Sequence, residues 1–393
     1  MSEPAMPAAP VYLDHNATTP PLREAVLEMV DVLQRVWANP SSTHAAGQAA
    51  RRVLSDARVR VAQLLGCLPA ELVFTSGATE ANNSAVLGAL AARRGEGRQR
   101  LVLSAVEHPG LLQLAQRLQG EGVPVDLIPV DCQGRLDLDA AQRLLGPDVA
   151  LLSVMAANNE TGVLVPTAAL AALARDSGAW LHVDATQVAG KLPLSFAHSG
   201  ADLMTVSAHK LGGPKGVGAL LLRKGLALPP LMPGRQERQR RGGTENLPGI
   251  VGFAAACEHA AATLPAQAAR LLVLRQRLED GLQAALPAVH IYGADAERLP
   301  NTTCLRFGQL DAERVLSRLE RAGIQASSGA ACSAGGTQPS HVLLAMGESA
   351  ALARCSVRLS MGTHTTADDI ERCIQAARVS LGPLLLAEGA LAA

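Results

Sequence analysis

Aromatic residues are scarce in this chain, at 2% of its 393 residues. Proteins that bind RNA or single-stranded DNA stack bases on aromatic rings, so this composition argues against such a role. An excess of charge is missing too, because 35 basic and 35 acidic side chains cancel. A neutral chain has no overall field that would draw it to nucleic acid or to an anionic membrane. We therefore expect neither as a partner.

Long uncharged apolar runs are also missing. We find no run of about 18 such residues and predict no membrane-spanning segment. The first ten residues have neither a basic start nor an apolar stretch, which is typical of a tail and not of a secretory signal. These features predict a cytoplasmic protein.

The cysteines lack any paired spacing. There are seven of them, an odd number, and no CxxC motif occurs, which argues against a disulfide framework and a zinc site, so we expect no metal. We interpret most of them as small buried hydrophobic residues. They are Cys67, Cys132, Cys257, Cys304, Cys332, Cys355 and Cys373.

Short apolar runs alternate with helix-length segments through the first half of the chain. Their spacing of about 20–30 residues is what right-handed βαβ crossovers require, and it predicts an α/β fold with a mostly parallel, seven-stranded sheet. The last run follows its predecessor too closely for a crossover helix, so we expect it to return antiparallel. The expected strands are 72–75, 101–104, 125–130, 150–155, 180–183, 203–206 and 217–222.

The length exceeds what one hydrophobic core usually supports, about 250–300 residues, and predicts two domains. Helices are expected at about 22–36, 45–65, 250–264 and 266–286, and strands at 302–307 and 357–360. We predict a large domain over 17–262 and a small α+β domain over 11–16 and 263–381. The tails are 1–10 and 384–393.

Lys210 follows the apolar run 203–206 and precedes a glycine-rich turn. A lysine in this place loses water around its ammonium group, so its pKa should fall and its amine could form a Schiff base with a carbonyl. A solvated lysine at a strand end is the alternative.

Other expected strands also end in polar residues, and ligands of such sheets bind beyond the carboxyl ends of the strands. Residues 76–80 contain small hydroxyl side chains and Gly77, and they begin an expected helix. Such a helix start can bind a phosphate, although the same residues could be a plain helix cap. Asp184 ends an apolar strand, where an unpaired carboxylate is costly, so we expect a cation beside it, such as a protonated pyridine nitrogen. His108 could lie flat on the ring. Each cluster alone could be a cap or a turn, but five at five strand ends indicate one site.

These motifs, taken in order, resemble the pyridoxal-phosphate enzymes of aminotransferase class V. More narrowly, they are similar to cysteine desulfurases that supply sulfur for iron–sulfur clusters and thio-modifications. The similarity runs from Tyr12 to about Leu381 and implies the type I fold of pyridoxal-phosphate enzymes. The motifs are Ser-Gly-Ala-Thr-Glu at 76–80, Glu-His-Pro at 107–109, Asn-Asn-Glu-Thr-Gly at 158–162, His-Val-Asp-Ala-Thr-Gln at 182–187, Ser-Ala-His-Lys at 207–210, and Ser-Ser-Gly-Ala-Ala-Cys at 327–332.

The resemblance implies a role for each matching residue. Lys210 would hold pyridoxal 5′-phosphate covalently and later move the substrate's α-proton. Asp184 would bind the pyridine nitrogen, His108 would stack on the ring, and Asn159 and Gln187 would hydrogen-bond its phenolic oxygen.

The resemblance also assigns the phosphate, the substrate and a second subunit. The planar guanidinium of Arg358 would bind the carboxylate of L-cysteine. The phosphate ligands would be the backbone of Ala78, the side chains of Thr79, Ser207 and His209, and Thr244 from the other subunit of a homodimer.

Cys332 lies in a stretch with no apolar period and with glycines on both sides. By resemblance, its thiolate takes the sulfur of the substrate as a persulfide and alanine is released. The span to Pro339 is as long as in desulfurases that pass sulfur directly to a partner, such as an iron–sulfur scaffold or a sulfur carrier. Without the resemblance, any one of the seven cysteines would be interpreted as a small buried hydrophobic residue, because free cysteines most often are.

Two features separate this chain from the usual family pattern, and two alternative functions stay open beside them. Met232 to Arg238 stands where the family usually has a run of glycines before Gln-Glu-Arg, and the residues after Cys332 also differ. A selenocysteine lyase or a transaminase on the same cofactor is one alternative. A sulfur carrier or assembly scaffold without turnover is another.

Overall fold

The computed structural model describes residues 9–329 and 338–392. Cys332, the predicted persulfide carrier, lies outside the described residues. The larger sheet has seven strands in the order β2-β8-β7-β6-β5-β3-β4, and β8 runs antiparallel to both of its neighbours while the other pairs are parallel. This confirms the predicted sheet. Its strands are β2 (Leu72–Thr75), β3 (Arg100–Ser104), β4 (Val125–Ile128), β5 (Val149–Met155), β6 (Trp180–Asp184), β7 (Leu203–Ser207) and β8 (Gly218–Leu222).

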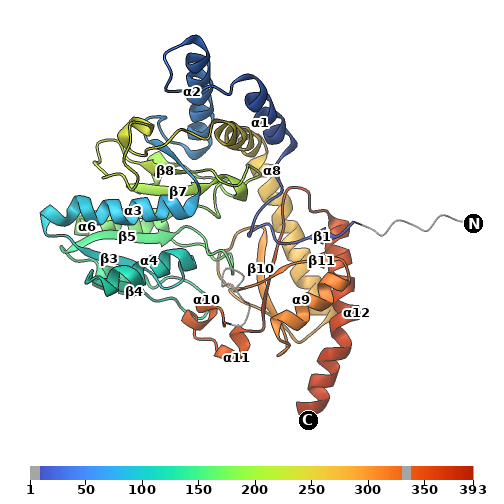
Figure 1. The fold of residues 1–393 in the computed structure, drawn as a ribbon. Coiled ribbons are helices and arrows are strands. Elements are labelled where there is room, and N and C mark those ends of the chain that lie inside the picture. Colours follow the sequence, from blue (N-terminus) through green and yellow to red (C-terminus); the bar gives the residue numbers. More distant parts are fainter. Residues whose placement is uncertain (1–8, 330–337, 393) are drawn as a thin grey trace, which may run out of the picture.

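Helices cover both faces of this sheet, which is why its strands are nearly continuous apolar runs. One face packs on α3 (Ala78–Arg93) and α4 (Pro109–Gly120). The other packs on α5 (Leu138–Leu144), α6 (Thr167–Ser177), α7 (Phe196–Ser199), α2 (Ala45–Leu65) and the start of α8 (Leu247–Ala285). In Figure 1, α1 (Arg23–Arg35) and α2 lie beside α8 at the top of the molecule.

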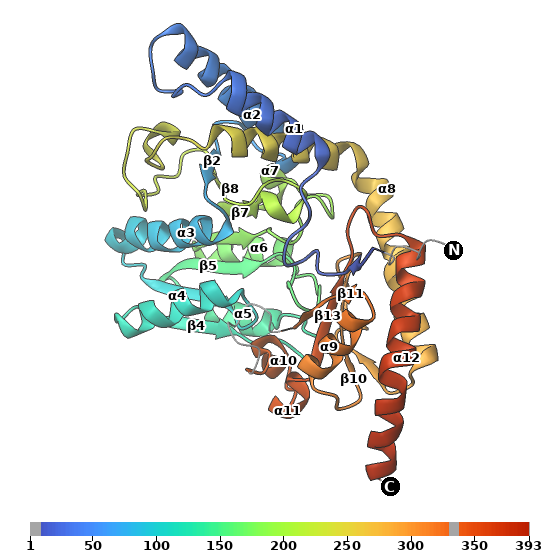
Figure 2. The ribbon, with the colours of Figure 1, turned by 45° about the vertical axis from the view of Figure 1, so that its right-hand side comes forward.

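A second, antiparallel sheet follows in the order β12-β13-β10-β9. The N-terminal segment packs beside this part, because β1 (Val11–Tyr12) pairs with β11 (Ile324–Gln325). Figure 2 shows α8 passing from the larger sheet to this part, where it runs next to α12 (Ala367–Ala392). The remaining elements are β9 (Val289–Ile291), β10 (Thr302–Phe307), α9 (Ala312–Arg321), β12 (Ser327–Ser328), α10 (His341–Ala345), α11 (Ala350–Ala353) and β13 (Ser356–Ser360).

The prediction of two helices at 250–264 and 266–286 is wrong, because α8 continues through Pro265. A proline removes one helical N–H, and the helix persists because its first part packs in the core of the larger sheet and its second part in that of the smaller. The end of the chain also differs, since α12 extends through Pro383 into the predicted tail. The domain division at 262/263 falls inside α8 and stays a prediction.

The apolar character of α8 belongs to the protein core. Among the described residues, it is the one helix long and apolar enough to cross a membrane by length and composition. However, 61% of its most apolar window is buried inside the protein. We therefore interpret it as a core helix of a soluble protein.

Candidate active site

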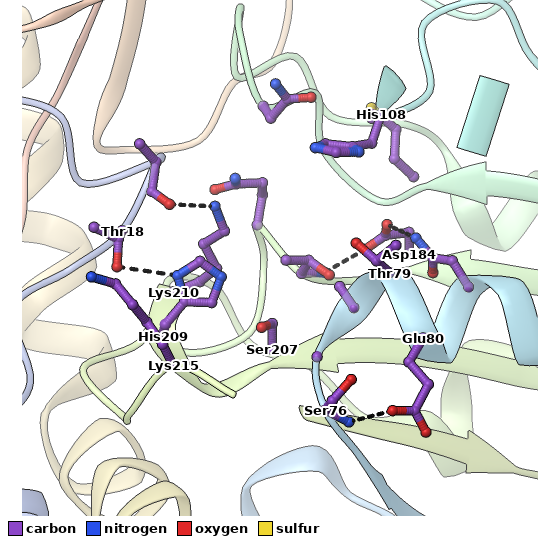
Figure 3. A pocket seen from close by; sticks show the side chains of 18 of the residues that line it. Thr18, Ser76, Thr79, Glu80, His108, Asp184, Ser207, His209, Lys210 and Lys215 are labelled. Carbon is purple, nitrogen blue, oxygen red and sulfur yellow. Dashed lines mark hydrogen bonds between the residues drawn. The ribbon is translucent and has the colours of Figure 1, made fainter. Parts of the chain in front are cut away.

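A cavity of about 550 Å³ opens beyond the carboxyl ends of β5, β6 and β7. Figure 3 shows His108, Asp184 and Lys210 around this space. Nine of the predicted site residues line it, so the expectation that the strand ends converge is confirmed. They are Ala78, Thr79, His108, Asn159, Asp184, Gln187, Ser207, His209 and Lys210.

Lys210 is delivered to the cavity by a short 3-10 turn, Ala208–Lys210, directly after β7. Gly212 then reverses the chain with a φ of +91°, where a Cβ atom would lie 2.7 Å from a side-chain carbon of Leu22. The Lys210 amine donates to two backbone carbonyls, Asn16 O at 2.6 Å and Ala17 O at 2.8 Å. The N-terminal segment therefore fixes the position of the predicted reactive amine.

Asp184 ends β6, and its carboxylate is oriented by two neutral donors. Asn82 Nδ2 donates to Oδ2 at 2.7 Å, and the Thr186 N–H donates to Oδ1 at 3.0 Å. Neutral donors orient a carboxylate without cancelling its charge, so the charge remains available to a cation in the cavity. Asn82 was given no role from the sequence, although an asparagine three residues after Thr79 on the same helix was a usable signal.

His108 caps the start of α4, and its Nδ1 accepts a hydrogen bond from the Gly110 N–H at 3.1 Å. Burial lowers its pKa, against the opposing effect of nearby Asp184. The ring is therefore neutral near pH 7, with its proton on Nε2. Its neighbour Glu107 is fully buried, and burial raises the pKa of that carboxyl to about 8.

The predicted phosphate end of the cavity lies at the start of α3, where backbone N–H groups and the helix dipole favour an anion. His209 lines the same cavity, and burial first, then the charge of Lys210, lowers its pKa to about 4. Its Nδ1 is 3.1 Å from the Thr18 hydroxyl. If that hydroxyl donates, Nε2 carries the proton and can donate to a phosphate.

Thr244 does not line the main cavity. It is exposed and lines a neighbouring cavity of about 120 Å³, which shares Ser76 and Gly216 with the main one. Close by, Arg241 pairs with Glu80 at 2.9 Å, and Glu80 accepts the Ser76 N–H at 2.8 Å. The loop that precedes Thr244 is therefore tied to the predicted phosphate end.

The loop before Thr244 departs from the usual family sequence, and its backbone is unusual. Glu237, Arg238 and Gln239 all have positive φ angles, of 45°, 57° and 66°. Such angles are costly for residues other than glycine unless the surroundings impose them. Here Arg58 and the Phe74 N–H hold the buried Glu237 carboxylate, with Arg58 Nη1 at 2.9 Å from Oε2.

Arg358 lies in β13 with only 2% of its surface exposed, and it is not among the residues that line the cavity. Its Nη2 contacts Asp14 Oδ1 at 2.7 Å, and its Nη1 donates to Asn159 O at 3.0 Å. The structure thus brings it against a cavity residue but pairs it with a carboxylate of its own chain.

Asn16 was given no role from the sequence, yet it connects both parts of the site. Its carbonyl accepts from Lys210 and from Gln187 Nε2, the latter at 3.1 Å. Its side-chain Nδ2 donates to Thr302 Oγ1 at 2.9 Å and to Asn159 O at 3.2 Å. The motif at 12–20 was recognised, but nothing local in it indicated contacts this far along the chain.

The cavity suits pyridoxal 5′-phosphate. It offers an amine, a carboxylate held by neutral donors and the N-terminus of a 16-residue helix, the three groups that an aldehyde, a pyridine nitrogen and a phosphate need. Two buried oxygens of its lining, Asn159 Oδ1 and Thr186 Oγ1, have no hydrogen-bond partner within 9–329 and 338–392. Polar capacity is thus left for a ligand.

The aminotransferase class-V family profile matches residues 11–373. The chain belongs to this family. It is 46% identical over 368 residues to a cysteine desulfurase of Cereibacter sphaeroides, covering 93% of this chain and 94% of that protein. Its fold is that of type I pyridoxal-phosphate enzymes, and its cofactor is pyridoxal 5′-phosphate.

Solved structures agree with this assignment. A NifS-like protein superposes with a TM-score of 0.89 at 33% identity, covering 95% of this chain and 99% of that one. SspA in complex with cysteine superposes with a TM-score of 0.79 at 30% identity, covering 90% and 99%.

Proposed function

We propose that this protein is a pyridoxal-phosphate-dependent cysteine desulfurase. It converts L-cysteine to L-alanine and transfers the sulfur to Cys332 as a persulfide, for delivery to an acceptor such as an iron–sulfur scaffold protein or a sulfur carrier. The observation that carries this proposal is the convergence of nine motif residues on one cavity, in a chain 46% identical to a cysteine desulfurase.

The cofactor, when bound, supplies an electron sink that stabilises negative charge at the substrate's Cα. Asp184 provides the carboxylate that keeps the pyridine nitrogen protonated, and Asn82 holds this carboxylate in place. Lys210 Nζ takes the α-proton, and the carbonyls of Asn16 and Ala17 keep its amine at the cavity. The neutral His108 ring covers one face of the site.

Arg358 is proposed to bind the substrate carboxylate. Its present contacts, Asp14 Oδ1 and Asn159 O, occupy one N–H on each terminal nitrogen. Since Asn159 lines the cavity, a carboxylate placed there lies next to the guanidinium. The substrate then either shares Arg358 with Asp14 or replaces it.

The sulfur transfer balances without an added oxidant. The Cys332 thiolate forms an S–S bond to the substrate sulfur while the substrate's C–S bond breaks. The electron pair of that bond stays with the former Cβ carbon, which takes a proton and becomes the methyl group of alanine. L-cysteine and the Cys332 thiol thus give L-alanine and a Cys332 persulfide.

We also propose that the enzyme is a cytoplasmic homodimer with no nucleic-acid or membrane partner. Helix α1 presents a row of exposed apolar side chains, Val26, Leu27, Val30 and Leu33, and Trp37 just beyond it is 79% exposed. Such a contiguous apolar surface suits a second protein chain. Leu33→Glu should shift the wild-type dimer to a monomer in sedimentation; a wild-type monomer would contradict the proposal.

The function is tested by supplying L-cysteine and a reductant and measuring sulfide and alanine. Cys332→Ala should lose sulfide release, while Cys132→Ala, which removes an exposed cysteine away from the cavity, should keep wild-type turnover. Undiminished turnover by Cys332→Ala would rule out the persulfide role. Alanine formed from selenocysteine but not from cysteine would instead indicate a selenocysteine lyase.

A further inference from the structure

Lys191 is a buried lysine for which the proposed mechanism has no use. It lies in the turn after β6, four residues beyond Gln187, and only 7% of its surface is exposed. Its amine donates to two side-chain oxygens, Asn16 Oδ1 at 3.0 Å and Gln187 Oε1 at 2.8 Å. Both acceptors are neutral amides, so neither compensates a positive charge.

The hydrogen bonding of Lys191 fits a neutral amine. A neutral amine has two N–H groups, which match its two acceptors, whereas an ammonium would add a third donor and a charge in a buried place. Burial first, and then the charges of Lys210 and Arg358, lower the pKa of Lys191 well below its usual value. Geometry and electrostatics therefore agree on the neutral form.

The bond from Lys191 decides which way the Gln187 amide faces. Because Oε1 of Gln187 accepts from Lys191, the amide nitrogen must serve as donor on the other side. One of its N–H groups goes to Asn16 O at 3.1 Å, and the second remains for the cavity that Gln187 lines. The same Asn16 carbonyl accepts from Lys210 at 2.6 Å.

We propose that Lys191 is a positioning residue for the cofactor, which holds Gln187 as a hydrogen-bond donor toward the phenolic oxygen of the pyridine ring. This rests on the proposed placement of that oxygen beside Gln187. Lys191 touches neither the cofactor nor the substrate and acts through the Gln187 amide, while its second bond keeps Asn16 in register.

The test is a pH titration of the visible absorbance of the bound cofactor in Lys191→Met. A donor to the phenolic oxygen favours its anionic form, so losing the donor should raise the apparent pKa of the cofactor by about one unit. Cofactor release in a dialysis assay should be several-fold faster. Lys224→Met, which removes an exposed lysine outside the cavity, should titrate like the wild type.

Gln187→Ala and the double variant with Lys191→Met separate this inference from the placement of the cofactor. The inference predicts that the double variant shifts no further than Gln187→Ala alone. Additive shifts, or a wild-type titration of Lys191→Met beside a shifted Gln187→Ala, would overturn the inference alone. An unshifted Gln187→Ala would overturn the placement and the inference with it.

A second variant covers the case in which Lys191→Met does not fold. Lys191→Gln keeps two N–H donors on a shorter side chain, so it should raise the apparent pKa of the cofactor less than Lys191→Met does. If Lys191→Met does not fold, the shift in Lys191→Gln is compared with that in Gln187→Ala and should be the smaller of the two. A shift in Lys191→Gln equal to or larger than that of Gln187→Ala would contradict a role as a donor.

Discussion

The two halves of the site differ in how their charged groups are held. On the cofactor side, Asp184 faces an open cavity and is oriented by neutral donors. On the proposed substrate side, Arg358 is buried and already paired with Asp14. The cofactor half is therefore preformed, whereas the substrate half has its cation occupied by an internal carboxylate.

This difference has a consequence for selectivity. A buried guanidinium that loses its carboxylate is left uncompensated, which is strongly unfavourable. Asp14 can therefore leave Arg358 only when another anion takes its place. The α-carboxylate of an amino acid is such an anion, so an amine lacking that group should be a poor substrate.

The largest effect is expected from breaking the cofactor half at Lys210. Lys210→Ala removes the residue proposed both to attach the cofactor covalently and to accept the α-proton, so turnover of L-cysteine should fall by at least about a thousandfold. The visible absorbance of the cofactor should also change, and an unchanged far-UV circular dichroism spectrum would distinguish this loss from unfolding. Turnover within tenfold of wild type would show that another group moves the proton.

A smaller effect is expected from the substrate half. Arg358→Lys keeps the charge but loses the forked geometry, so kcat/KM should fall by about 10–100-fold, the value of one hydrogen bond to a charged group. The cofactor absorbance of the variant should match that of the wild type. A changed absorbance would show that Arg358 also affects the environment of the cofactor.

Asp14→Asn sharpens the comparison by removing the internal competitor. Asparagine can still accept a hydrogen bond from Arg358, but it no longer neutralises it, so KM for L-cysteine should fall several-fold. The free energy of unfolding should fall by up to about 3–5 kcal/mol, because the buried Arg358 loses the carboxylate that compensates its charge. An increased KM would mean that Asp14 orients Arg358 and does not compete with the substrate.

The smallest effect concerns Glu107, next to the cofactor half. Its pKa in the folded protein is about 8, above the ordinary value of 4.5, so the folded state binds more protons between these pH values. The contribution of this group to stability therefore falls as pH rises from about 4.5 to about 8. Glu107→Gln stays neutral and should gain stability relative to wild type over that range.

Thermal unfolding at about pH 5 and about pH 8.5 measures this effect. The matched control is Glu297→Gln, which changes an exposed carboxylate. Glu107→Gln and Glu297→Gln are each compared with the wild type at both pH values. If the two substitutions changed the melting temperature by the same amount at each pH, the raised pKa of Glu107 would be contradicted.

The sequence predicted the sheet and the convergence of its polar ends because both follow from local patterns. Apolar runs mark strands, and parallel strands place their carboxyl ends on one edge, so Asp184 and Lys210 had to lie near each other. The position of Lys210 could be predicted because it depends only on the end of its strand and on the turn at Gly212.

The residues that were missed depend on contacts between distant segments. Asn82 and Lys191 are buried polar groups whose meaning comes from their acceptors, Asp184 and Gln187, and no periodicity reveals such pairs. The pairing of Arg358 with Asp14 joins residues 344 positions apart. The continuity of α8 through Pro265 likewise depends on packing against two cores.

The anchoring of the N-terminal segment determines when the site can form during synthesis. Asp14 and Asn16 are each translated 344 residues before their partners, Arg358 and Ser360. Contacts between such distant residues form late in folding. The larger sheet can fold earlier, but the amine of Lys210 acquires its final setting only after residue 360 has left the ribosome. Capture of the cofactor in its final geometry thus requires β13, and a chain truncated before β13 should hold the cofactor poorly.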